Sequence, residues 1–183
     1  MAVATNAKEL VYSSIDEIGR SKIRLGVVSD IRMSKYYIRE IVEKCQYKQK
    51  GLNFEALSAV CEVLLHFMLS TSGLPSERRI SFLEGINLDI VIPSLRQLKK
   101  DSRKSLIIQV VKTVDETDRK IQEAKTLQPD PDNIWLISTC PLIAGYRNYH
   151  LKYNQKFPYY NVIIDINAFL KNKDVDSLPF LQI

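Results

Sequence analysis

Residues 106–140 read LIIQVVKTVDETDRKIQEAKTLQPDPDNIWLISTC, and this stretch predicts a strand, a helix and a second strand in succession. The first run, Leu106–Val111, is almost continuously apolar and rich in β-branched residues, which is typical of a strand buried on both faces. Thr113 and Glu116 have the spacing of a capping box, whose hydroxyl and carboxylate satisfy the first free amides of a helix. The PDPD segment ends that helix, and a second apolar strand follows over 134–139. Because strands joined by one helix usually pair in parallel with a right-handed crossover, the stretch predicts a parallel strand pair.

The first third of the chain has helical patterning. Apolar residues recur at helical spacing over 7–18, 34–46 and 53–70, and the last of these carries the widest apolar stripe. Further strands are predicted over 88–92 and 159–165, where β-branched residues cluster.

These elements predict an α/β fold with three layers and a Rossmann-like topology. A helical part over 1–72 packs on a mainly parallel sheet of about four strands with crossover helices. The strands and helices alternate over 86–183, and the whole chain is predicted to form a single domain.

Composition sets the class of protein. The 183 residues are 45% hydrophobic and 26% charged, with a net charge of +5, so a folded chain is expected and a polyanionic partner is permitted. Cys45, Cys61 and Cys140 are far apart and predict neither a disulfide framework nor a metal site. The start of the chain lacks a secretory signal pattern, and no apolar run approaches the roughly 20 residues of a membrane span. We therefore expect a cytoplasmic protein without a membrane partner.

Three aspartates form the candidate catalytic set. Asp115 and Asp118 follow one predicted strand and Asp165 ends another, and ligands of parallel sheets bind at the carboxyl ends of strands. Clustered carboxylates suit Mg²⁺ or Mn²⁺, because hard cations prefer oxygen ligands. The alternative is a purely structural role, in which Asp115 is a first-turn acid of a helix and Asp165 caps the final helical turn.

The segment Val162-Ile163-Ile164-Asp165-Ile166-Asn167-Ala168-Phe169-Leu170 resembles the opening strand of PIN-domain nucleases. By this resemblance Asp165 is a metal ligand and Asn167 supports the site. The strand comes first in PIN domains and last here, so the resemblance implies a circularly permuted relative.

A basic and aromatic surface is the candidate binding site. Mixed cations and rings bind single-stranded nucleic acid, with cations on phosphates and rings under bases. The predicted binding residues are Arg147, Tyr149, Lys152, Tyr153 and Lys156, with a second cluster at Arg96, Lys99, Lys100 and Arg103. The alternative is that the tyrosines pack over the sheet and that the lysines form a solvated face.

Taken whole, the chain resembles an uncharacterised family of small proteins from thermoacidophilic archaea. This resemblance rests on Ile92-Pro93-Ser94-Leu95 leading into the run over 105–112, and it implies no activity. The leading interpretation is a non-catalytic interaction module without a cofactor, with single-stranded nucleic acid as its expected partner. The alternative is a divalent-metal-dependent nuclease with aspartates at the strand ends. The stripe over 53–70 and the apolar tail after Leu178 also permit a homo-oligomer.

Overall fold

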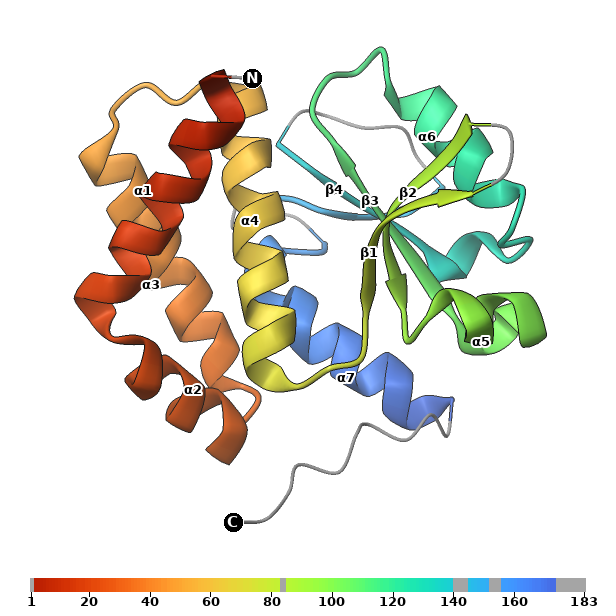
Figure 1. Ribbon diagram of the computed structural model, residues 1–183, viewed down its shortest axis with the longest axis horizontal. Helices are drawn as coiled ribbons and strands as arrows, with labels where there is room; N and C mark the ends of the chain where they lie inside the picture. The colour runs from red at the N-terminus through yellow and green to blue at the C-terminus, as the bar shows by residue number, and fades with distance from the viewer. Residues whose placement is uncertain (1, 83–84, 140–144, 152–155, 174–183) are drawn as a thin grey trace.

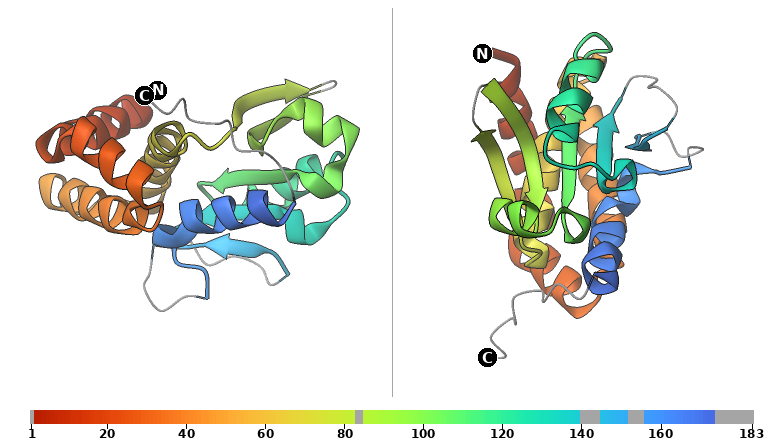
Figure 2. Two further views of the ribbon diagram at one scale, coloured as in Figure 1. Left: turned by 90° about the horizontal axis from the view of Figure 1, so that it is seen from below. Right: turned by 90° about the vertical axis from the view of Figure 1, so that its right-hand side faces the viewer.

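The computed structural model describes residues 2–82, 85–139, 145–151 and 156–173, and its helices and strands form successive layers (Figure 1). Helices α1, α2 and α3 pack on one side of α4, and α4 lies between them and the sheet. Figure 2 shows this arrangement from two further directions. The α-helices are α1 (Ala2–Ile18), α2 (Arg20–Ser29), α3 (Met33–Lys48), α4 (Phe54–Ser72), α5 (Leu95–Lys100), α6 (Thr117–Lys125) and α7 (Val162–Asn172).

Helix α4 is the central helix, as its apolar stripe predicts. The Asn53 side chain accepts a hydrogen bond from the Ala56 amide at 2.8 Å and caps its start. Gly73 ends it in the left-handed conformation with φ of 64°, which glycine adopts without strain. By length and composition alone this helix could cross a membrane, but Leu64 and Leu65 are fully buried in the core.

The sheet has five strands in the order β1-β2-β3-β4-β5. The pairs β3–β4 and β4–β5 are parallel, and helix α6 joins β3 to β4 as predicted. The pairs β1–β2 and β2–β3 are antiparallel, so the expectation of a mainly parallel sheet of about four strands is wrong in this half. The strands are β1 (Glu77–Phe82), β2 (Ile86–Ile92), β3 (Leu106–Val111), β4 (Ile134–Ser138) and β5 (Arg147–Tyr149).

The antiparallel half has a simple cause. Helix α5 packs beside β2 and does not carry the chain across the sheet, so the chain returns antiparallel along β2 as β3. Strand β1 was not predicted, because it begins with the charged and exposed residues Glu77-Arg78-Arg79 and so lacks an apolar strand pattern. A short 3-10 helix at Ser102–Lys104 completes the return.

The predicted strand over 159–165 is instead helical. A 3-10 turn at Tyr159–Asn161 leads into α7, and the segment that resembles the PIN strand lies in this helix. Val162, Ile166 and Leu170 are spaced by four residues and are buried in the core that contains α3 and α4. Burial of this stripe overrides the β propensity of the residues.

Two apolar clusters lie on the two faces of the sheet. Ile108 and Val110 face the larger cluster, which contains residues of α4 and α7. Ile107 and Val111 face the smaller cluster under α6. Gln109 lies between Ile107 and Val111 in β3 and is fully buried. Because side chains alternate along a strand, Gln109 points to the same α6 face as these two residues.

Strands β1 and β5 form the two edges among the described strands. Glu77, Arg78 and Arg79 are exposed on β1. Strand β5 has only three residues, and His150 just beyond it bonds to the Phe157 carbonyl at 3.0 Å and the Tyr159 amide at 2.8 Å.

Candidate functional site

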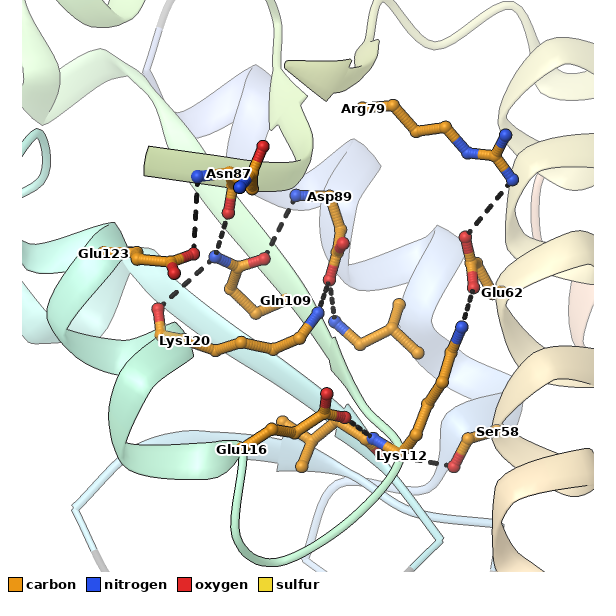
Figure 3. A network of polar contacts seen from close by, with 12 residues as sticks. Ser58, Glu62, Arg79, Asn87, Asp89, Gln109, Lys112, Glu116, Lys120 and Glu123 are labelled. Carbon is orange, nitrogen blue, oxygen red and sulfur yellow. Dashed lines mark hydrogen bonds and ion pairs between the residues drawn. The ribbon is translucent and has the colours of Figure 1, made fainter. Parts of the chain in front are cut away.

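Strands β2 and β3 separate at a fork that polar side chains fill (Figure 3). Their register runs from Ile92↔Leu106 to Ile90↔Ile108 and stops before Asp89 and Gln109. Beyond that point, hydrogen bonds from side chains replace the backbone hydrogen bonds between the two strands. The Gln109 Oε1 accepts the Asp89 amide at 3.1 Å, and Asp89 Oδ2 accepts the Val110 amide at 2.7 Å.

The Gln109 amide group also holds the neighbouring elements. Its Nε2 donates to the Asn87 carbonyl at 3.2 Å and to the Lys120 carbonyl at 3.3 Å. A buried polar side chain in an otherwise apolar strand is costly unless it is bonded in this way. Gln109 therefore fixes the fork relative to helix α6.

Helix α6 supplies a cation and a second carboxylate to the fork. Lys120 Nζ lies 2.5 Å from Asp89 Oδ2, and the side chains are 11% and 25% exposed. Glu123 lies one turn along the helix, and its Oε2 accepts the Asn87 amide at 3.4 Å. Arg119 binds the other oxygen of Glu123 at 2.6 Å.

A second polar cluster lies between the end of β3 and helix α4. Lys112 Nζ is 3.1 Å from Glu62 Oε2, and Arg79 from β1 approaches the other oxygen of Glu62 at 3.8 Å. The Glu116 carboxylate accepts the backbone amides of Lys112 and Thr113. This is the backward half of the predicted capping box, although helix α6 begins only at Thr117.

A basic groove of about 430 Å³ adjoins this cluster and contains Lys8, Tyr12, His66, Arg78 and Arg79. Burial, with the positive charge of Arg78 as the next cause, lowers the pKa of His66 to about 4, so the imidazole is neutral at pH 7. Arg79 lies opposite Asp89 in the β1–β2 register, between the pairs Arg78↔Ile90 and Ile80↔Leu88. Arg79 and Asp89 therefore lie on adjacent strands, although the groove is formed with α1 and α4 and the fork with α6 on the other face of the sheet.

The fork offers a small set of oxygen ligands. Within the described parts of the chain, no group of three or more His, Cys, Asp or Glu residues is placed to hold a metal ion. Both bonds of the Asp89 carboxylate end on Oδ2, and Oδ1 has no partner among the described residues. Mg²⁺ usually keeps several waters and takes one or two carboxylates from the protein. Asp89 Oδ1 could supply one such oxygen, whereas the Asn87 amide and Arg119 already engage the two oxygens of Glu123, so the described residues form no closed all-protein metal cage.

The aspartates predicted to form a catalytic set do not come together. Asp115 and Asp118 are exposed at the start of α6, on one face of the sheet. Asp165 lies on α7, which packs on the opposite face, and its Oδ2 accepts the Tyr149 hydroxyl at 2.6 Å. The prediction failed because 162–170 is helical, which moves Asp165 away from any strand end.

The predicted binding residues are divided between two places. Arg147 and Lys156 line one cavity, but Tyr149 is fully buried and is not a stacking platform at the surface. The second cluster lies on α5 and the 3-10 helix after it, with Arg96, Lys99, Lys100 and Arg103 exposed. Lys152, Tyr153 and the tail after Leu178 lie outside the described residues.

The sequence carries a signal for the fork that is separate from the aspartates at the predicted strand ends. Asp89 interrupts the apolar run Leu88–Ile92, and Gln109 interrupts Leu106–Val111. A polar residue in the middle of each of two buried strands indicates a shared polar site. Glu62 gives a similar signal within the apolar stripe of α4.

Comparisons with known proteins agree on the fold. No family model matches the sequence, and no curated protein matches it, so the resemblance to an archaeal family gains no support. A complex of the restriction endonuclease PspGI with its substrate DNA is similar, with a TM-score of 0.61 and 15% identity over 91% of this chain and 93% of that chain. Metal-depleted Ecl18kI with uncleaved, modified DNA has a TM-score of 0.55 and 10% identity, over 91% and 79% of the two chains. A second complex of metal-depleted Ecl18kI, with uncleaved DNA, has a TM-score of 0.53 and 10% identity, over 96% of this chain and 82% of that chain. The chain therefore has an α/β fold of the kind found in restriction endonucleases.

Proposed function

We propose that this protein binds DNA and hydrolyses its phosphodiester bonds with a divalent metal ion at the β2–β3 fork. The observation that carries the proposal is the pairing of Asp89 with Lys120 at 2.5 Å, where two strands separate. The similar solved structures are restriction endonucleases in complex with DNA, which supports DNA as the partner.

Each polar residue of the fork has a role in this proposal. Asp89 would hold Mg²⁺ or Mn²⁺, and Glu123 would become a second ligand on giving up its contact with Arg119. The ion would activate water and stabilise charge on the phosphate. Lys120 would place its ammonium beside the phosphate, where it stabilises the negative charge that develops in the transition state. Gln109 would keep Asp89 and helix α6 in position through its three hydrogen bonds.

The basic groove would bind the DNA backbone. Lys8, Arg78 and Arg79 line it, and Arg79 lies on the strand adjacent to that of Asp89. Phosphate contacts from Lys and Arg supply most of the sequence-independent affinity for DNA. A backbone held in the groove would pass close to the fork.

Binding without cleavage is the second candidate function. Asp89 Oδ2 already accepts an amide and an ammonium, and the described residues supply no third carboxylate. This arrangement favours a protein that keeps the DNA-binding surface and does not hydrolyse DNA.

One experiment separates the two candidates. Purified protein is incubated with labelled duplex and single-stranded DNA in Mg²⁺, Mn²⁺ or EDTA, beside Asp89→Asn and the matched controls Asp118→Asn and Asp165→Asn. The proposal expects metal-dependent cleavage that only Asp89→Asn abolishes. Salt-sensitive binding without cleavage would establish the second candidate. Cleavage lost in Asp165→Asn but kept in Asp89→Asn would overturn the assignment of the fork.

A further inference from the structure

A cavity of about 690 Å³ lies on the face of the sheet opposite Asp89 and Lys120. Trp135 of β4 and Arg147 of β5 are register partners on the face that packs against α7, whereas Lys120 belongs to the helix on the other face. The cavity volume lies within the range of about 300–1,000 Å³ that is typical of small-molecule sites. It is a second site, and the proposed hydrolysis does not use it.

Aromatic rings surround the Arg147 guanidinium. Its carbon lies 4.6 Å from the ring centre of Trp135, 4.6 Å from that of Phe157 and 6.0 Å from that of Tyr149. Rings at these distances attract a guanidinium and restrict its motion. Its N–H groups lie in the guanidinium plane, so stacking leaves them able to bind an anion.

The charge of Arg147 is not neutralised by a carboxylate. Among the residues that the structure describes, neither Arg147 nor Lys156 forms a salt bridge, although both line the cavity. Asp165, which also lines it, accepts the Tyr149 hydroxyl at 2.6 Å. The Arg147 guanidinium also hydrogen-bonds the Tyr149 side chain, which helps to fix it in place. An arginine that is held in this way, without a salt bridge to a carboxylate and beside a lysine, is suited to a phosphate group, which guanidinium binds through two parallel hydrogen bonds.

The rest of the cavity is suited to a planar, polar body. Phe169 supplies a ring, and Asp132 and Asn172 supply hydrogen-bonding groups at its wall. The cavity is far larger than an inorganic anion needs. We propose that it binds a free nucleoside monophosphate, with the phosphate on Arg147 and Lys156 and the base against the aromatic wall.

The chain contains a built-in reporter for this test. Trp135 is its only tryptophan, and it stacks directly under Arg147. Tryptophan fluorescence is followed while adenosine and guanosine monophosphate, ribose 5-phosphate, inorganic phosphate or a single-stranded oligonucleotide is added, without divalent metal. Arg147→Lys is compared with Arg32→Lys, a matched control on the helical layer whose arginine pairs with Asp30.

The proposal expects saturable binding of a nucleoside monophosphate, weakened about tenfold or more by Arg147→Lys and unchanged by Arg32→Lys. Phe157→Leu, which keeps an apolar side chain but removes one ring, should also weaken it. Equal binding of inorganic phosphate, binding only of the oligonucleotide, or no fluorescence change would each overturn it. Circular dichroism of each variant confirms folding. Because no DNA cleavage is measured, failure here is distinct from failure of the proposed hydrolysis.

Discussion

The Lys120 ammonium contacts Asp89 where only 11% of the lysine side chain is exposed. Removing one partner of a largely buried pair leaves the other charge without compensation. Because this pair is partly exposed, Asp89→Asn should lower the free energy of unfolding by about 1–3 kcal/mol. Urea denaturation of Asp89→Asn, Lys120→Met and the double variant measures this. If the effects of the single variants simply add, the ion pair contributes no coupling energy and the prediction is wrong.

His66 makes stability depend on pH. Burial lowers its pKa to about 4 in the folded protein from 6.5, so between these values the unfolded chain binds more protons. Stability is therefore complete above pH 6.5 and falls as the pH drops towards 4. We expect a loss of about 2.5 kcal/mol by pH 4.5 from this residue. Unfolding of the wild type and His66→Gln at pH 7.5 and 4.5 checks it, and equal losses in the two proteins would contradict it.

At the scale of residues, sequence could identify which positions are unusual but not which ones meet. Asp89 and Gln109 stand out in apolar strands, yet their contact depends on strand register. The pairing of Lys120 with Asp89 further depends on the rotation of helix α6. Such contacts between residues distant in sequence are set by packing and not by local pattern.

Among the elements, helix α4 and the β3–α6–β4 unit could be predicted from local sequence, because their apolar periodicity and their boundary residues indicate the same structure. Helix α7 did not, since its β-branched run has strand propensity but its apolar residues also repeat at helical spacing. Periodicity alone leaves such short apolar runs ambiguous. Packing of this segment against α3 and α4 favours the helical conformation.

The start of α4 gives a direct test of an element boundary. Asn53→Ala removes the acceptor of the Ala56 amide, so it should lower the free energy of unfolding by about 1 kcal/mol. Asn53→Asp keeps an acceptor and is the control that should stay near the wild-type value. Thermal and urea unfolding measure both, and equal destabilisation by the two substitutions would show that capping is not the cause.

For the whole molecule, the class of fold was predictable but the antiparallel half was not. The α/β class followed from a helical third and alternating elements, whereas strand β1 has an exposed, charged sequence. The hairpin of β1 and β2 places Arg79 opposite Asp89, so the missed strand also carries part of the candidate site.

The charge of the whole molecule predicts how DNA binding responds to salt. If Arg78 and Arg79 contact phosphates, changing both to Gln should reduce the slope of log affinity against log salt by about 2. The affinity should fall at low salt for all duplex sequences alike. Fluorescence anisotropy over a salt series gives the slope, with Arg32→Gln and Arg39→Gln together as a charge-matched control. An unchanged slope would remove the groove from the DNA-binding surface.

The two edges of the sheet bear on behaviour at high concentration. An unpaired edge is a template for strands of other molecules, and natural proteins block it with charge, shortness or proline. Strand β1 has exposed charges, and the three-residue β5 is followed by bonds from His150 to both neighbours of Pro158. Both edges of the sheet therefore oppose pairing with strands of other molecules. Concentrated solutions of the folded protein should not form amyloid fibres by edge-to-edge pairing.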